Sequence, residues 1–125
     1  MTLKVAIVDD NSFLIHAIKE KLSFFEDVAV KHTSLNGSEL LAKLEENHNL
    51  DIILMDIEMP EMDGLEATRV IRTGKEKVRN PQIPIVALTA HALKDYEDKS
   101  YNAGMNNYLT KPVDIEQLSI VLQSL

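Results

Sequence analysis

Residues 53–64 of the chain read ILMDIEMPEMDG. Its apolar run ends at Met55, and the next residue is the acid Asp56. Strands and buried places both disfavour aspartate, so an acid here indicates a functional group at the end of a buried strand. Further on, Asp63 and Glu66 have the spacing of a helix capping box. The stretch therefore predicts a strand, a loop that carries an acid, and a helix.

Short runs rich in β-branched residues alternate with helical patterns along the whole chain. We expect strands over residues 3–8, 28–32, 51–55, 83–88 and 107–109. A spacing of about 3.6 residues relates two apolar sets: Leu14, Ala17, Ile18, Leu22 and Phe25, then Ile115, Leu118, Leu122 and Leu125. We also expect Gly104 to end the fourth helix. This order predicts one α/β domain over residues 1–125, with a parallel sheet and helices on both faces.

The composition narrows the class of protein. A chain of 125 residues with 45% hydrophobic residues can bury one proper core. Its net charge of -7 argues against a nucleic-acid surface, which needs an excess of Lys and Arg. Without cysteines, disulfides and thiolate metal sites are impossible. No apolar run approaches the roughly 20 residues of a membrane span, and we see no signal peptide. We therefore expect a soluble, cytoplasmic domain without membrane insertion.

Polar residues follow four of the predicted strands. They are Asp9 and Asp10, Asp56, Thr89, and Lys111. Since ligands of an open parallel sheet bind outside the carboxyl ends of its strands, these side chains should converge on one edge. Three neighbouring carboxylates raise one another's pKa unless a cation lies between them. Carboxylates, waters and a phosphate are the usual ligands of Mg²⁺, and Lys111 adds a fixed positive charge suited to a phosphoryl group.

The nucleophile of this cluster can be found by elimination. The four glycines, at positions 37, 64, 74 and 104, are scattered and make no phosphate-binding loop. No His, Cys or Ser follows a strand with a base beside it. A carboxylate is the nucleophile that remains, and carboxylates form acyl phosphates. The residues by themselves therefore predict an aspartyl-phosphate site with magnesium.

Four motifs now point to a family. They are VDD at 8–10, MDIEMPEMDG at 55–64, ALTA at 87–90 and YLTKP at 108–112. With these motifs in this order, the chain closely resembles the CheY-like receiver domain of two-component response regulators over nearly its whole length. PIVALTAHAL and MNNYLTKPVD look most like receivers of hybrid histidine kinases. The resemblance implies a flavodoxin-like fold with strand order 2-1-3-4-5. It also implies signalling rather than enzymatic turnover, with only self-catalysed phosphorylation and dephosphorylation.

The resemblance implies a role for each acid. Asp56 would be the phosphoacceptor, taking a phosphoryl group from a histidine kinase or a histidine phosphotransfer protein. Asp10 and Asp56 would hold Mg²⁺ directly, together with the backbone carbonyl of Glu58. Asp9 would act mainly through a metal-bound water.

The resemblance also implies how the phosphoryl group is read. Thr89 would donate its hydroxyl to one phosphoryl oxygen, and Lys111 would pair with another. The Lys111–Pro112 peptide bond would be cis. Tyr108 would turn inward when Thr89 moves. The face made by the fourth helix, the last strand and the last helix would then bind a partner, an output domain or a second copy.

Two other classes share parts of this pattern. A haloacid-dehalogenase-type phosphohydrolase also uses an aspartate at a strand end, and Glu58 supplies its second acid. It then requires Thr where this chain has Pro60, and it usually carries a cap domain. A flavodoxin-like flavin carrier needs a hydroxyl- and glycine-rich loop after the first strand, where this chain has Asp9-Asp10-Asn11.

Overall fold

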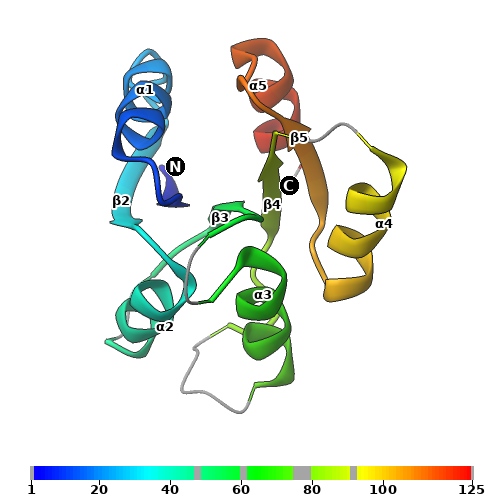
Figure 1. The fold of residues 1–125 in the computed structure, drawn as a ribbon. Coiled ribbons are helices and arrows are strands. Elements are labelled where there is room, and N and C mark those ends of the chain that lie inside the picture. The colour runs from blue at the N-terminus through cyan, green and yellow to red at the C-terminus, as the bar shows by residue number, and fades with distance from the viewer. Residues whose placement is uncertain (1, 47–48, 60–61, 75–79, 91–92, 125) are drawn as a thin grey trace.

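The computed structural model describes residues 2–46, 49–59, 62–74, 80–90 and 93–124 (Figure 1). Its strands are β1 (Leu3–Val8), β2 (Val28–Ser34), β3 (Ile52–Asp56), β4 (Ile85–Thr89) and β5 (Asn107–Thr110). Its helices are α1 (Ser12–Leu22), α2 (Gly37–Glu45), α3 (Gly64–Thr73), α4 (Lys94–Ala103) and α5 (Ile115–Gln123). The strands form one parallel sheet in the order β2-β1-β3-β4-β5. The predicted α/β class and strand order are confirmed.

The sheet separates two apolar layers. Side chains of β1 alternate between them, so Val5 and Ile7 pack with α1 and α5 while Ala6 and Val8 pack with α2 and α3. Helix α4 lies on the α3 side of the sheet (Figure 1). Every residue of β3 and of β4 is buried, as expected for central strands covered on both faces. The carboxyl ends of these strands meet at one edge.

Four of the five strands end one or two residues later than predicted, and two of these ends carry site residues. Asp56 and Thr89 are the last residues of β3 and β4, not the first residues after them. Asp56 still pairs in register with Leu88, and the N–H of Ile57 donates to the Leu88 carbonyl at 3.0 Å. The ladder continues through a polar residue because the neighbouring strand offers partners there. The strand therefore holds the Asp56 backbone rigidly.

The helices follow the predicted pattern with a shift in each of the two sets. In α1 the buried residues are Ile15, Ile18 and Leu22, whereas Leu14 is half-buried and Phe25 lies beyond the helix. In α5 they are Leu118, Val121 and Leu122, of which Val121 was not predicted. Ile115 is half-buried, and Leu125 lies outside the described residues. None of the helices in the described ranges combines the length and the apolar character that a bilayer crossing needs.

The expected helix ends are confirmed. The Asp63 side chain accepts from the N–H of Glu66 at 2.8 Å, which caps α3. Gly104 ends α4 with φ at 109°, a left-handed conformation that favours glycine.

Candidate functional site

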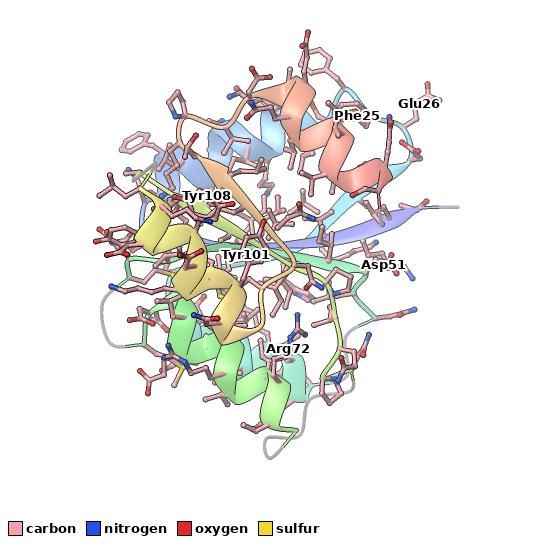
Figure 2. The ribbon with its side chains drawn as sticks, turned by 90° about the vertical axis from the view of Figure 1, so that its right-hand side faces the viewer. Phe25, Glu26, Asp51, Arg72, Tyr101 and Tyr108 are labelled. Carbon is pink, nitrogen blue, oxygen red and sulfur yellow. The ribbon has the colours of Figure 1, made fainter. Side chains whose placement is uncertain are left out.

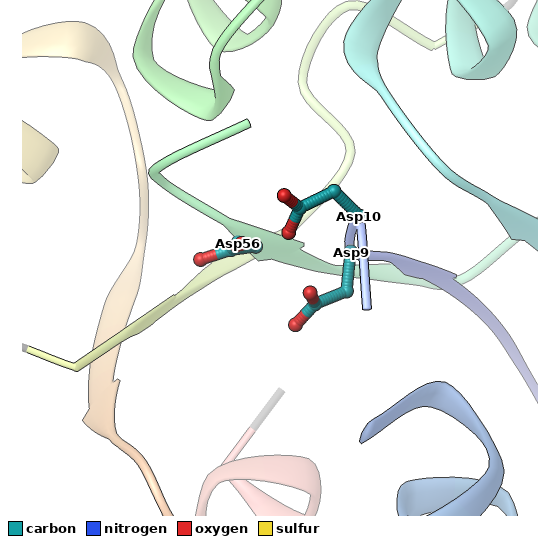
Figure 3. A group of neighbouring side chains, drawn as sticks. All are labelled: Asp9, Asp10 and Asp56. Atoms are coloured by element: carbon teal, nitrogen blue, oxygen red, sulfur yellow. The ribbon is translucent and has the colours of Figure 1, made fainter. Parts of the chain in front are cut away.

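Three carboxylates meet at the carboxyl edge of the sheet. Asp9 and Asp10 follow β1, and Asp56 ends the neighbouring strand β3. One oxygen from each lies within 4.8 Å of the others, and Figure 3 shows the three side chains around one space. Asp9 and Asp56 are buried, whereas Asp10 is exposed. The predicted cluster therefore exists, with a solvent-facing side through which a ligand can enter.

Lys111 is the cation of the cluster. Its Nζ lies 2.8 Å from Asp9 Oδ2 and 3.1 Å from Asp56 Oδ1. The backbone places it there, because the Lys111 N–H donates to the Thr89 carbonyl at 2.7 Å and extends the β4–β5 pairing. Burial lowers the pKa of Lys111, but its contacts with the two carboxylates outweigh burial and raise the pKa above its usual value. The side chain is therefore a permanent positive charge. The peptide bond between Lys111 and Pro112 is cis, as predicted.

One ammonium does not balance three carboxylates. Burial, and then the charge of Asp9, raise the pKa of Asp56 from 3.8 to about 6, although Lys111 pulls it down. The raised pKa shows that the ionised form of Asp56 is disfavoured, by burial first and by the charge of Asp9 second. A bound cation would stabilise the ionised carboxylates, and the donor set fits a divalent metal ion with oxygen ligands.

Asp9 has the coordination capacity such a metal needs. Its Oδ1 accepts the N–H of Asn11 at 2.9 Å. Its Oδ2 is fully buried and forms the ion pair with Lys111. Within the described ranges, this oxygen has no hydrogen-bond partner of acceptable geometry. A buried carboxylate oxygen in this situation has lone-pair capacity left for a metal-bound water.

The loop after β3 is held close to the site. The N–H of Gly64 donates to the Ile57 carbonyl at 2.9 Å. Between them, Met59 is buried and the side chain of Glu58 is exposed. The backbone carbonyl of Glu58 as a metal ligand stays a prediction, and Pro60 lies outside the described residues.

Thr89 and Tyr108 lie on adjacent strands. Thr89 is buried at the end of β4, and its register partner on β5 is Thr110. Tyr108 lies two residues earlier on β5, half-buried against the apolar layer that contains α2 and α3. Burial, and to a lesser degree the charge of Glu97, raise the pKa of Tyr108. Their roles in a switch stay predictions.

Two residues at the site were missed from the sequence. Asn11 caps α1 by accepting from the N–H groups of Phe13 and Leu14, and its own N–H donates to Asp9 Oδ1. Its position one residue before the helix was the available signal. Gly64 is needed beside Asp56 for steric reasons that no local pattern reveals.

The site opens into a cleft with two parts. The polar part, about 260 Å³, is lined by Asp9, Asp10, Asn11, Leu14, Asp56, Glu58, Ala90 and Lys111. A smaller apolar hollow of about 120 Å³ adjoins it, lined by Leu14, Ala17, Ile18, Lys21, Lys111, Pro112 and Val113. Phe13, in the first turn of α1, is 86% exposed. A large apolar side chain thus stands unburied close to the charged cluster.

Comparison with known proteins agrees with this geometry. The profile of the response regulator receiver domain matches residues 5–123. The chain is 34% identical over 119 residues to the sensor protein GacS of Pseudomonas syringae pv. syringae and 36% identical over 124 residues to the histidine-protein kinase BarA of Escherichia coli K12. These alignments cover 95% and 98% of this chain but 13% of each relative.

A solved structure gives a close match over the full length. It is the receiver domain of the sensor histidine kinase PA1611 from Pseudomonas aeruginosa PAO1, with a magnesium ion coordinated in its active-site cleft. The TM-score is 0.83 at 32% identity, and the alignment covers 99% of this chain and 97% of that one.

Proposed function

This chain belongs to the response regulator receiver domain family, and on that premise we propose that it accepts a phosphoryl group on Asp56 in two-component signalling. The observation that carries the proposal is the contact of Lys111 with both Asp9 and Asp56 beside Asp10. A metal-binding acid cluster alone would not require a half-buried ammonium. An acid cluster with a fixed cation suits a phosphoryl group, which brings its own negative charge.

We propose Mg²⁺ as the cofactor. Asp10, Asp56 and the backbone carbonyl of Glu58 would hold it, with Asp9 acting through a bound water. The ion supplies charge neutralisation for the phosphoryl oxygens and lowers the pKa of Asp56, so that the nucleophile is ionised. The related PA1611 receiver, with magnesium in its cleft, supports this assignment.

The transfer step uses groups of this chain. A carboxylate oxygen of Asp56 forms a bond to the phosphorus of a phosphohistidine while the phosphorus–nitrogen bond breaks. The imidazole leaves with the partner, and Asp56 becomes a mixed anhydride. Lys111, already 3.1 Å from Asp56 Oδ1, would pair with the added negative charge. The chain would act as a phosphoacceptor that catalyses only its own phosphorylation and dephosphorylation, and not as an enzyme with turnover on other substrates.

We propose that Thr89 and Tyr108 read the modification. Thr89 would move toward the new acceptor oxygens, and Tyr108 would fill the space left behind it. The face of α4, β5 and α5 would change shape and bind an output domain or a second copy. Exposed Tyr101 on α4 and Ile120 on α5 support an apolar contact there.

The phosphoryl donor would be a histidine kinase or a histidine phosphotransfer protein. Its histidine must reach Asp56 through the cleft, so the donor must cover the rim of that cleft. Phe13 and the apolar hollow beside Leu14 offer such a protein a contact next to the charged site. We propose that residues 1–125 form one receiver domain, in the cytoplasm where this donor acts. The activity of any longer protein that contains it is beyond this proposal.

The alternatives are disfavoured by particular residues. Pro60 stands where the phosphohydrolase pattern requires Thr. The acids after β1 would repel a flavin phosphate.

Phosphorylation with acetyl phosphate and magnesium tests the proposal. We expect one phosphoryl group, labile to hydroxylamine, in the wild type and none in Asp56→Asn. Asp95→Asn, an exposed acid on α4, is the matched control and should be labelled like the wild type. Full labelling of Asp56→Asn would overturn the assignment.

A further inference from the structure

The turn that joins β2 to α2 contacts both chain segments that carry the acids. At its start, the carbonyl of Ser34 accepts the N–H of Asp9 at 3.0 Å. At its end, the N–H of Gly37 donates to the carbonyl of Met62 at 3.2 Å. Met62 lies in the loop between Asp56 and α3. Two backbone hydrogen bonds of one short turn therefore connect the segment after β1 with the loop after β3.

Gly37 has no room for a side chain where it faces this loop. An added Cβ would lie 2.9 Å from the Met62 carbonyl oxygen, 2.9 Å from Met62 Cγ and 3.0 Å from Ala67 Cβ. Gly37 is buried, and its φ is not positive. Glycine is therefore needed here for the close approach of two backbones and not for an unusual backbone conformation. As the first residue of α2, Gly37 has an N–H without an acceptor inside the helix, which leaves it available to Met62.

The turn is held firmly to the elements on either side of it. The Asn36 side chain accepts the N–H of Glu39 at 2.8 Å, which caps α2. One turn further along the helix, the Nζ of Lys43 donates to the Thr33 carbonyl of β2. The same Nζ lies 3.3 Å from Glu39 Oε1. Leu40, on the same helix, is fully buried. The turn therefore keeps a fixed shape between β2 and α2.

The loop after β3 needs such support because part of it extends beyond the sheet. The hydrogen bonds with β4 end at the N–H of Ile57, and Glu58 follows it. Strand pairing therefore does not place the Glu58 backbone. Burial of Met59 and the hydrogen bond from Gly37 to Met62 help to hold the loop. Figure 2 shows α2 and α3 on the side of the sheet opposite α1 and α5, and the loop is supported from this α2–α3 side.

We propose that Gly37 is a positioning residue for the acid cluster. Through Gly37, the β2–α2 turn holds the loop that carries Glu58 at a fixed distance from the segment that carries Asp9 and Asp10. Gly37 would contribute no ligand to the metal ion, and its effect would be on the spacing of the two segments that do. The effect on metal affinity rests on the proposed magnesium site, whereas the bridge between the two segments can be tested without metal.

Backbone amide shifts of the metal-free full chain test the bridge. In Gly37→Ala we expect shift changes at Glu58 on one side and at Asp9 on the other, because the added Cβ must displace the loop or the turn. Ser38→Ala changes the exposed next residue of the same helix and is the matched control. It should leave the amides of Asp9 and Glu58 unchanged. Shift changes in Gly37→Ala that stay within α2 and α3 would overturn the bridge.

Magnesium titration by calorimetry tests the consequence for the site. Gly37→Ala should weaken binding by about tenfold, as is typical when a residue that orients metal ligands is changed. Ser38→Ala should bind like the wild type. Leu44→Ala removes a buried side chain near the other end of α2 and lowers stability through lost packing, but it should keep the wild-type affinity. Wild-type affinity in Gly37→Ala, or an equal loss in Leu44→Ala, would overturn the positioning role.

A double variant keeps the test decisive if Gly37→Ala folds poorly. Adding Met62→Ala removes the contact with Cγ and leaves the overlap with the carbonyl oxygen. This protein should fold better and still bind magnesium about tenfold more weakly than Met62→Ala alone. Equal affinities of the two would overturn the inference. Failure of the proposed cofactor would look different, because the wild type itself would then bind no magnesium, while the metal-free amide shifts would still decide the bridge.

Discussion

The carbonyl oxygen of Asp56 occupies the space where a side chain on Gly64 would begin. An added Cβ on Gly64 would lie only 2.2 Å from that oxygen. The strand end that carries the acid and the first turn of α3 therefore touch through backbone atoms. This close approach requires glycine at position 64, although the φ of Gly64 is not positive.

Gly64→Ala should destabilise the protein and disturb the acid cluster together. We expect a loss of about 3 kcal/mol in the free energy of unfolding, because backbone must shift to relieve the overlap. Urea denaturation measures this loss. Gly74→Ala is the control. Among the described residues its Cβ meets only Pro81, at 3.6 Å, and its cost of about 1 kcal/mol comes from positive φ. Equal losses in the two variants would contradict the steric role of Gly64.

The raised pKa of Asp56 predicts a pH-dependent stability in metal-free protein. The folded state binds this proton more tightly than the unfolded chain, since the pKa rises from 3.8 to about 6. The stabilising contribution is therefore complete below about pH 4 and is lost as the pH rises through about 6. Asp56→Asn places an uncharged side chain at this position at every pH. It should match the wild type near pH 4 and exceed its stability by up to about 3 kcal/mol near pH 7.5.

Denaturation in the presence of a chelator at both pH values checks this expectation. Adding Mg²⁺ near pH 7.5 should stabilise the wild type and narrow its gap to Asp56→Asn, because the ion binds only the folded state. If the difference in unfolding free energy between the two proteins were the same at pH 4 and pH 7.5, the pKa of Asp56 would not be raised by its surroundings.

Magnesium affinity should separate the roles of the site residues. Asp10→Ala removes a charged ligand and should weaken binding by roughly tenfold or more. Lys111→Ala should not weaken it, because it removes a competing cation from Asp9 and Asp56. Glu58→Gln is the matched control, because Glu58 is proposed to bind the metal through its backbone carbonyl, which this substitution keeps. Magnesium titration followed by calorimetry distinguishes the three. A comparable loss in Asp10→Ala and Lys111→Ala would contradict these roles.

Phe13 should matter for the protein donor and not for the chemistry. Phe13→Ala should slow phosphoryl transfer from a histidine phosphotransfer protein by roughly tenfold, as for a contact residue at an interface, and leave labelling by acetyl phosphate unchanged. Phe24 is 84% exposed just beyond the other end of α1, so Phe24→Ala is a matched control that should affect neither rate. If both variants slow transfer equally, the donor does not use the cleft end of α1.

Beryllofluoride, which mimics the phosphoryl group on Asp56, should reveal the switch. We expect changes in backbone amide shifts around Tyr108 and along Leu93 to Ala103, as the active form becomes the major state. Thr89→Val removes the hydroxyl at nearly constant volume and should suppress these distant changes. Shift changes confined to the loops at the acid cluster in the wild type would defeat the proposed coupling.

Much of the site could be predicted because of how a parallel sheet is built. Carboxyl ends of parallel strands share one edge, so acids placed after separate apolar runs had to meet. Asp9, Asp10 and Asp56 do so within 4.8 Å. Boundaries were less predictable. Asp56 and Thr89 belong to their strands because neighbouring strands supply hydrogen-bond partners, which the local sequence does not encode. In α1, two neighbouring rows of apolar residues both fit the helical spacing. The sequence therefore could not show that Ile15, rather than Leu14, is buried.

Local periodicity and the ends of apolar runs were enough to predict the fold class, the edge of the sheet that carries the chemistry and the residue types gathered there. Which atoms meet depends on the tertiary structure. The ammonium of Lys111 lies between Asp9 and Asp56, the backbone of Gly64 fits against Asp56, and Arg72 bonds to Gly104 across 32 residues. Such contacts depend on strand register and on helix position to within an ångström, and those are set by the packing of the whole core.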